Sequence, residues 1–383
     1  MAETSIEWTE RTWNPIVGCS VLSPGCTNCY AMKMAARLER MGQDRYVGLT
    51  KPTKAGPVWT GELRLVEDAL TLPLRRRKPT TWFVNSMSDL FHESVPDVWI
   101  DRVFAVMALA PQHTFQVLTK RSARMRAYLT QLDEEPARDT CRRITLAWPG
   151  RTPIPEGGIT FPLANVWLGV SAEDQRRADK RIPDLLATPA AVRFVSAEPL
   201  LGPIDFAEWI ERIEHCGGCG AESGPTEEDR CPKCGAENVL ITTWGEEQAE
   251  RYRNGDRYDE DNAAGRADIE GTSPTIDWLI VGGESGPNAR PMHPQWARDI
   301  RDQCAAAGVA FHFKQHGAWI SVPDLRRLPG GSGPGFGAFD HCRHDMEAEC
   351  VRVGKKAAGR LLDGVEHNGM PDTPRPALST GRG

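Results

Sequence analysis

Cysteine is the residue type whose spacing in this sequence is most informative about chemistry. The chain contains eleven cysteines, and seven of them fall into two tight groups. Thiols clustered in this way bind metal more often than they form disulfides when the compartment is reducing. One group is Cys19, Cys26 and Cys29 in a C-x6-C-x2-C pattern, and the other is Cys216, Cys219, Cys231 and Cys234 in two C-x2-C pairs.

The four-cysteine group predicts a structural zinc ribbon. Two C-x2-C pairs supply the four thiolates of a tetrahedral zinc site, and the glycine after each pair eases the backbone where it folds back. A closed site of four thiolates leaves no position open for a substrate. We therefore expect this module to stabilise a fold or a contact and to carry no chemistry itself.

The three-cysteine group is the candidate reactive centre. Three thiolates can hold three irons of a [4Fe–4S] cluster and leave the fourth iron open for a substrate or cofactor. The alternative is a structural zinc site in which His92 or His316 supplies the fourth ligand. The sequence pattern favours the cluster, because no fourth cysteine lies close by in the chain.

Composition limits the class of protein. The chain has 383 residues, of which 40% are hydrophobic and 26% charged, and this excludes disorder as the dominant state. It has no apolar run long enough for a membrane span and no signal peptide, so we expect a cytoplasmic protein without membrane contact. The net charge of −6 arises mostly in the stretch 241–275, so the remaining chain is close to neutral and compatible with a nucleic-acid partner.

Short apolar runs alternate with helical patterns along most of the chain. Continuous apolar strands are typical of a parallel sheet that is covered on both faces. Seven such units predict an α/β fold, either a full or partial parallel (β/α) barrel or a doubly wound sheet. The expected strands are Trp13–Gly18, Thr81–Ser86, Thr114–Thr119, Val166–Ser171, Val192–Ala197, Trp278–Gly283 and Val309–Lys314.

The expected domains follow from this pattern. Residues 1–211 and 276–320 form the barrel with the three-cysteine loop, and 212–240 form an inserted zinc ribbon. Residues 241–275 form an acidic insert or linker, and 321–383 form a C-terminal extension. Helices are expected at 31–41, 99–110 and 294–307, where glycine or proline stops each pattern.

Polar residues follow nearly every expected strand. The carboxyl ends of parallel strands meet on one face, where such folds assemble their active sites. Carboxylates there can also cap the helices that follow, although caps do not require lysine, glutamine or histidine. The polar positions are Asn85, Ser86, Asp89, Lys120, Arg121, Glu173, Glu198, Glu284 and Lys314.

Several stretches together resemble a known family. The chain resembles the phage-associated three-cysteine-motif proteins, which look like divergent relatives of the radical S-adenosylmethionine enzymes. The family's reaction is not generally established. The matching stretches are Trp13–Cys19, Ser23–Tyr30, Asn85–Phe91, Val117–Arg121, Gly169–Ser171, Ser196–Gly202, Gly282–Gly286, Lys314–Gly317 and Val353–Gly364.

This resemblance implies a partial barrel in which the open iron of the cluster binds S-adenosylmethionine. The cysteine spacing differs from the usual C-x3-C-x2-C, Asn28 replaces an aromatic residue, and Gly-Gly-Glu follows the sixth strand instead of the second. These departures bear more on whether S-adenosylmethionine binds than on whether the cysteines hold a cluster. The implied cofactor-binding residues are Cys19, Cys26, Cys29, Tyr30, Asn85, Ser86, Asp89, Gly282 and Gly283, and the implied catalytic residues are Lys120, Glu173, Glu198, Glu284 and Lys314.

Two functions remain open at this point. The first is a radical S-adenosylmethionine-type enzyme that acts on a nucleotide or nucleic acid and requires an electron donor. Its glutamates would hold the ribose or tune protonation, and Lys120, Arg121 and Lys314 would pair with the anionic substrate. The second is a non-catalytic nucleic-acid interaction protein in which both cysteine sites are structural and basic clusters at 75–78, 120–126 and 176–181 contact phosphates.

Overall fold

A single parallel sheet of seven strands organises the chain. The computed structural model describes residues 4, 6–134, 159–210, 214–216, 222–223, 239–241, 275–328, 340–344 and 348–371. The strands lie side by side in chain order, each parallel to the next. They are β1 (Arg11–Trp13), β6 (Thr81–Val84), β7 (Thr114–Thr119), β8 (Val166–Ser171), β9 (Val192–Ala197), β13 (Trp278–Gly282) and β14 (Ala310–Gln315).

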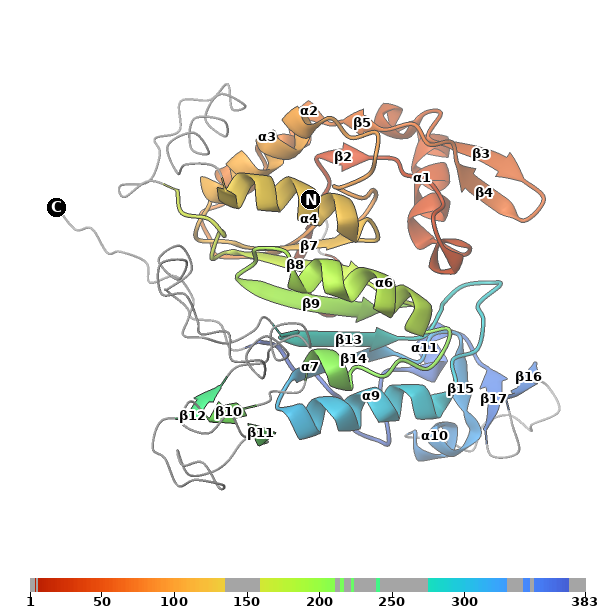
Figure 1. Ribbon diagram of the computed structural model, residues 1–383. Coiled ribbons are helices and arrows are strands. Elements are labelled where there is room, and N and C mark those ends of the chain that lie inside the picture. Colours follow the sequence, from red (N-terminus) through yellow and green to blue (C-terminus); the bar gives the residue numbers. More distant parts are fainter. Residues whose placement is uncertain are drawn as a thin grey trace.

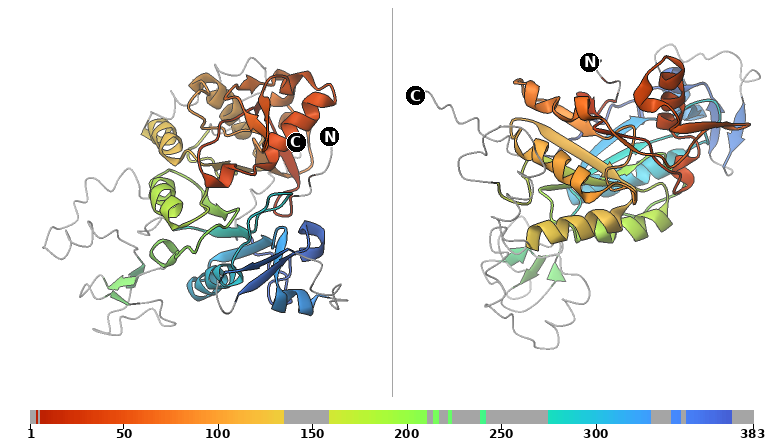
Figure 2. Two further views of the ribbon diagram at one scale, coloured as in Figure 1. Left: turned by 90° about the vertical axis from the view of Figure 1, so that its right-hand side faces the viewer. Right: turned by 90° about the horizontal axis from the view of Figure 1, so that it is seen from above.

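The sheet curls into a half-barrel, as the end-on view shows (Figure 2, left). Within the described chain it ends at β1 and β14 and does not close. The sequence prediction of a parallel α/β sheet is confirmed, and the architecture is the partial barrel among the alternatives. Right-handed strand–helix–strand connections place the helices on the outer, convex face. They are α3 (Asp97–Ala108), α4 (Ser122–Glu134), α6 (Gln175–Leu186), α7 (Ala207–Ile210) and α9 (Pro294–Ala307) (Figure 1).

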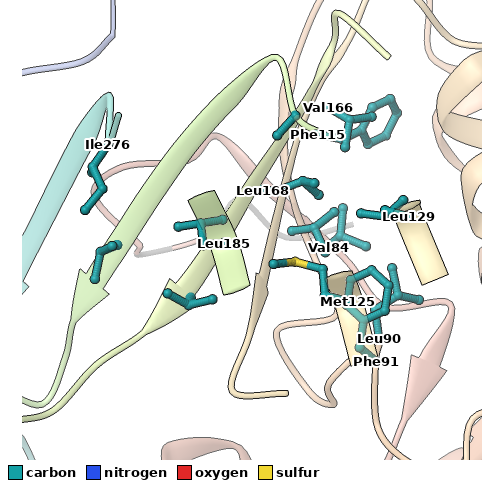
Figure 3. Close-up of a cluster of buried hydrophobic side chains, with 14 of the residues drawn as sticks. Val84, Leu90, Phe91, Phe115, Met125, Leu129, Val166, Leu168, Leu185 and Ile276 are labelled. Carbon is teal, nitrogen blue, oxygen red and sulfur yellow. The ribbon is translucent and has the colours of Figure 1, made fainter. Parts of the chain in front are cut away.

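The main core lies between the sheet and these helices. Val84, Phe115 and Leu168 on the strands pack with Met125, Leu129 and Leu185 on the helices (Figure 3). Burial of these side chains is the dominant favourable term for a sheet covered by helices. Every residue of β8 and of β13 is buried, which explains why these strands read as continuous apolar runs.

The concave face carries a second, aromatic cluster at the base of the half-barrel. Phe83, Trp167, Phe194 and Trp278 come from four strands and enclose Trp8 of the N-terminal segment. Side chains alternate between the faces of a strand, so residues two positions apart share a face. The residues that follow in phase at the carboxyl ends are therefore also concave-facing: Asn85, Lys120, Glu173, Glu198, Gly282 and Lys314.

The first connection of the sheet is much longer than the others. It contains β2 (Ile16–Val17), η1 (Pro24–Cys26), α1 (Tyr30–Arg40), η2 (Asp44–Tyr46), β3 (Thr50–Thr53), β4 (Gly56–Trp59), β5 (Arg64–Leu65), α2 (Glu67–Leu70) and η3 (Pro73–Arg75). The predicted single strand Trp13–Gly18 is wrong, because the sheet strand stops at Trp13 and β2 pairs antiparallel with β5. Proline at position 15 cannot donate to a strand ladder, which accounts for the break.

A small C-terminal sheet packs beside β14. It consists of β15 (Trp319–Ser321), β16 (His341–Arg343) and β17 (Glu349–Arg352), with α10 (Val322–Arg327) and α11 (Lys355–Ala358). The chain then returns along β14, where Phe313 N donates to His367 O at 3.0 Å and Gly369 N to Phe311 O at 2.9 Å. This return covers an edge that would otherwise present unpaired backbone groups.

The insertion between β9 and β13 contains β10 (Glu214–Cys216), β11 (Glu222–Ser223) and β12 (Val239–Ile241), which form an antiparallel sheet. Cys219, Cys231 and Cys234, and the side chain of Cys216, lie outside the described residues, and so does the acidic insert. The zinc ribbon therefore stays a prediction. Among the helices that the structure describes, none has the length and apolar character needed to cross a membrane.

The concave cluster generates a stability prediction at Gly169. A Cβ atom added there would lie 2.5 Å from the ring of Phe194, closer than real side chains approach. We expect Gly169→Ala to destabilise the fold by about 1–3 kcal/mol through overpacking, measured by urea unfolding. In a Gly169→Ala/Phe194→Leu double variant, the loss should be smaller than the sum of the two single losses. Strictly additive losses would contradict this packing.

Candidate active site

The three-cysteine loop crosses the mouth of the half-barrel, the edge where the sheet strands end. Gly18, at its start, has a φ of +95°, and a Cβ there would collide with the carbonyl oxygen of Glu62. Gly18 N donates to Met87 O at 3.2 Å, which ties the loop to the segment after β6. Cys26 ends η1, and Cys29 is the N-cap residue of α1. The sequence prediction that all three cysteines lie at the strand ends agrees with this placement.

Two buried carboxylates anchor the loop, and Glu173 is the first. Its side chain follows β8, is 0% exposed, and accepts a hydrogen bond from Gly25 N at 3.2 Å. Arg181 lies 2.9 Å and Lys120 3.8 Å from its Oε2. Burial alone would raise the pKa of Glu173, but Lys120, a hydrogen bond from Ser23 and Arg181 lower it to about 2. Glu173 therefore stays ionised. It is paired with two cations and holds the loop through its hydrogen bond to Gly25 N.

Glu284 is the second anchor and follows β13. It accepts hydrogen bonds from Asn28 Nδ2 at 2.9 Å and from the Arg290 side chain at 2.6 and 2.9 Å. Arg290 also donates to Pro24 O at 2.9 Å, so one guanidinium joins the loop to the carboxylate. Asn28 is thus a docking contact between the loop and the sheet.

The thiols lie in a half-buried, mutually interacting group. Burial is the largest cause that raises the pKa of Cys19, to about 12, and nearby Asp89, Cys29 and Cys26 add to it. Burial also raises the pKa of Cys29. Thiols in such surroundings are unreactive until a cation stabilises the thiolate. The three half-buried cysteines fall within eleven residues of one anchored loop, which makes this loop the candidate site.

Arg121 links Cys19 to a buried ion-pair network. Its Nη1 donates to Cys19 Sγ at 3.8 Å and to Asp89 Oδ2 at 3.0 Å, and its Nε donates to Glu93 at 3.0 Å. Asp89 also accepts hydrogen bonds from Thr119 Oγ1, Lys120 N and Phe91 N. Both carboxylate oxygens of Asp89 are therefore engaged, so Asp89 acts here as a positioning residue and not as a contact for a cofactor amino group.

Glu198 and Lys314 form a second charge pair on the concave face. Lys314 Nζ lies 3.1 Å from Glu198 Oε1, and their side chains are 14% and 18% exposed for Glu198 and Lys314 respectively. A Cβ at Gly282 would lie 2.5 Å from Glu198 Oε1, so this glycine makes room for the carboxylate. A Cβ at Gly283 would collide with His316 O. The sequence predicts that these two glycines contact a cofactor. In the structure, each makes room for a neighbouring group.

Tyr30 begins α1, and Asn85 and Ser86 directly follow β6. Tyr30 is 52% exposed, and its hydroxyl donates to Ser86 O at 2.7 Å. Asn85 is 3% exposed and accepts from Ile16 N at 3.3 Å. Its Nδ2 is buried and has no hydrogen-bond partner in the described part of the chain. An unpaired buried donor is costly, so this amide group is a candidate ligand contact.

A mononuclear metal site does not fit the described residues. Across the ranges that the structure describes, no group of three or more His, Cys, Asp and Glu side chains is arranged to hold one metal ion. His92 Nε2 pairs with Ser20 Oγ at 2.8 Å, and His316 Nε2 pairs with Leu361 O at 2.8 Å. One zinc ion needs all its ligands within about 2.0–2.3 Å, which disfavours the three-cysteine-one-histidine alternative. A cluster places each thiolate on a different iron.

The cations predicted to face an anionic substrate are already paired. Lys120 and Arg181 face Glu173, Arg121 faces Asp89 and Glu93, and Lys314 faces Glu198. Arg121 and Arg181 are also buried, which removes two members from the basic clusters of the nucleic-acid interaction hypothesis. The sequence gives no indication of the roles of Asn28, Arg290 or Lys33. The contact between Asn28 and Glu284 spans 256 residues. Arg290 lies six residues after Glu284, in no recognisable motif.

Comparison with known proteins identifies a family. The family model described as "Protein of unknown function (DUF5131)" matches residues 3–371. Neither the curated proteins nor the solved structures contain a match. The match covers nearly all of the described chain and names no activity, so the site geometry carries the functional argument.

The loop anchors generate a prediction at Glu173. Glu173→Gln leaves the buried Arg181 and the partly exposed Lys120 without their counter-charge. Loss of one partner of a buried ion pair costs about 3–5 kcal/mol. We expect the loop to open more often, so that site-resolved thiol labelling of Cys19, Cys26 and Cys29 accelerates at least about tenfold. Glu208→Gln, at an exposed carboxylate on α7, is the matched control and should label like the parent chain. Equal labelling rates in both variants would show that Glu173 does not hold the loop.

Proposed function

The chain belongs to the DUF5131 family, and we propose that it is an iron–sulfur enzyme of the radical S-adenosylmethionine type that acts on a nucleotide or nucleic-acid-related substrate. The observation that carries this proposal is the anchoring of the three-cysteine loop by Glu173 and Glu284 at the mouth of an open parallel half-barrel. Active sites of parallel α/β folds lie at this edge. The resemblance of the cysteine loop to phage-associated three-cysteine proteins adds support.

The donor set fits a [4Fe–4S] cluster held by Cys19, Cys26 and Cys29. Thiolates are the protein ligands of such clusters, and three of them leave one iron free. Arg121 donates a hydrogen bond to Cys19 Sγ, and hydrogen bonds to ligating sulfurs are one way in which proteins set cluster potentials. The half-buried loop limits the access of water and oxygen. A reducing compartment such as the cytoplasm suits such thiols.

When bound, such a cluster supplies the electron that reductively cleaves S-adenosylmethionine, and an external electron donor replenishes it. The chain's own groups position the reactants. The unpaired Nδ2 of the buried Asn85 is a hydrogen-bond donor at the end of β6, and Tyr30 is an exposed aromatic side chain at the start of α1. The Glu198–Lys314 pair lies on the same concave face and can bind ribose hydroxyls or move a proton.

The other residues of the expected catalytic set have positioning roles in this proposal. Glu173 and Glu284 hold the cysteine loop, and Lys120 balances the charge of Glu173. Gly282 and Gly283 allow Glu198 and the chain around His316 to approach closely. Glu198 and Lys314 are therefore the charged residues of this set for which we propose direct contact with a reactant.

Anaerobic reconstitution with iron and sulfide tests the proposal. We expect about four irons and four sulfides per chain, broad visible absorbance, and 5′-deoxyadenosine when S-adenosylmethionine and dithionite are added. Cys19→Ala, Cys26→Ala and Cys29→Ala should each lose both the absorbance and the product. Cys342→Ala, at a half-exposed cysteine on β16, is the control and should retain both.

Two results would contradict this assignment. A chain that takes up no iron has no cluster site. The second result is a cluster whose spectrum does not change when S-adenosylmethionine is added, together with no cleavage of S-adenosylmethionine. The site is then a structural or electron-transfer centre.

We also propose a structural zinc ion at Cys216, Cys219, Cys231 and Cys234, on the grounds of their paired spacing. Metal analysis of the purified chain should give one zinc in addition to the iron. Cys231→Ser should lose the zinc and loosen the insertion while the sheet stays folded, because the insertion lies in one connection between strands. Retention of zinc in this variant, or loss of all folded protein, would contradict a separate ribbon.

A further inference from the structure

The mouth of the half-barrel is charge-balanced and therefore poorly suited to bind phosphate. Lys120 and Lys314 each face a glutamate, and Arg121 faces two carboxylates. A phosphate brought to any of these cations would also meet its carboxylate partner. The mouth thus favours a neutral group such as a base or sugar, and the phosphates of a nucleotide-like substrate must be bound elsewhere.

A pocket of about 510 Å³ borders the loop that follows β13. Its lining includes Gly286, Arg352 and Lys355. Gly286 belongs to the same loop as Glu284 and Arg290, which dock the cysteine loop. The arginine donates to the carbonyl oxygens of Gly286 and Pro287, so its guanidinium is held at the pocket wall. The pocket and the cysteine site therefore share one loop.

The carboxylates near the pocket cations hold them weakly. Asp340 lies 3.5 Å from Arg352 and is 72% exposed. Glu7 lies 3.5 Å from Lys355, whose side chain is 45% exposed. Exposed pairs at such distances contribute little and are easily replaced by a competing anion. These two cations, unlike those of the mouth, remain open to a phosphate.

Lys33 supplies an independent observation. It lies on α1 four residues after Cys29, and residues at this spacing share one face of a helix. Its Nζ is buried and has no hydrogen-bond partner among the residues that the structure describes. A Cβ on Gly286 would lie 3.4 Å from this Nζ, so the ammonium group sits against the pocket loop. A buried ammonium without a partner is costly, which points to an anionic ligand.

We propose that Lys33, Arg352 and Lys355 form a phosphate-binding subsite for the phosphodiester backbone of a polynucleotide. This inference rests on the proposed function for the identity of the reacting group and deepens it by naming a polymeric substrate. The mouth, which favours uncharged groups, binds the base and sugar of one nucleotide. The cations along the loop after β13 bind the phosphates of the neighbouring nucleotides. A mononucleotide does not need two separate binding regions.

The test is binding of a fluorescent single-stranded oligonucleotide to the full chain, measured by anisotropy as a function of salt. We expect Lys33→Gln and Lys355→Gln each to weaken binding about tenfold at low salt, as for a lost hydrogen bond to a charged group. Each should also lower the slope of log K against log salt by about 0.7. Lys51→Gln, at an exposed lysine on β3 outside the basic clusters, makes the same charge change elsewhere and should bind like the parent chain.

Several results would overturn the subsite. The first is that the chain binds no oligonucleotide. The second is that Lys51→Gln and Lys355→Gln weaken binding equally. The third is that a mononucleotide binds as tightly as the oligonucleotide. Binding to Cys19→Ala separates this inference from the proposed function, because that variant should keep oligonucleotide affinity while losing the cluster. Failure of the function then appears as missing cluster absorbance in the parent chain, whereas failure of the subsite appears in the anisotropy of the lysine variants.

Discussion

The site depends on docking a cysteine loop onto two buried carboxylates. Glu173 and Glu284 come from the ends of different strands and hold the loop at Gly25 and Asn28. A buried carboxylate is stable only when cations and hydrogen bonds compensate for its lost hydration. Lys120 and Arg181 do this for Glu173, and Arg290 does it for Glu284. Much of the charge at the mouth is thus required to place three thiols over the sheet.

The alternation of side chains along the strands explains why these groups converge. On β9, Phe194 belongs to the aromatic base, and Ser196 and Glu198 follow it at intervals of two toward the mouth. β13 and β14 repeat the arrangement with Trp278 below Gly282 and with His312 below Lys314. The concave face therefore changes from packed rings to paired charges within the length of one strand. The rings fix the curvature that brings the charged ends together.

The sequence predicted the sheet well and its long-range contacts poorly. The ranges of β7, β8 and β9 match the apolar runs because buried parallel strands carry little polar interruption. The polar residues that follow the strands also indicated which edge of the sheet carries the candidate site. The roles of Glu173 and Glu284 could not be predicted, since their partners on the cysteine loop are distant in sequence; Asn28 and Glu284 are 256 residues apart. The sequence did not single out Lys33, because only the three-dimensional surroundings show that its ammonium group is unpaired.

The distribution of charge, more than its total, determines which ligands this chain can bind. A net charge of −6 would repel a polyanion if it were spread evenly. Much of the acidic excess lies in the stretch 241–275, and the acids at the mouth are consumed by internal pairs. Screening limits the reach of exposed charges to about 8–10 Å at moderate salt. Near Gly286 the three cations Lys33, Arg352 and Lys355 outnumber the two carboxylates that face them, Asp340 and Glu7. This gives a local excess of positive charge in a chain that is acidic overall.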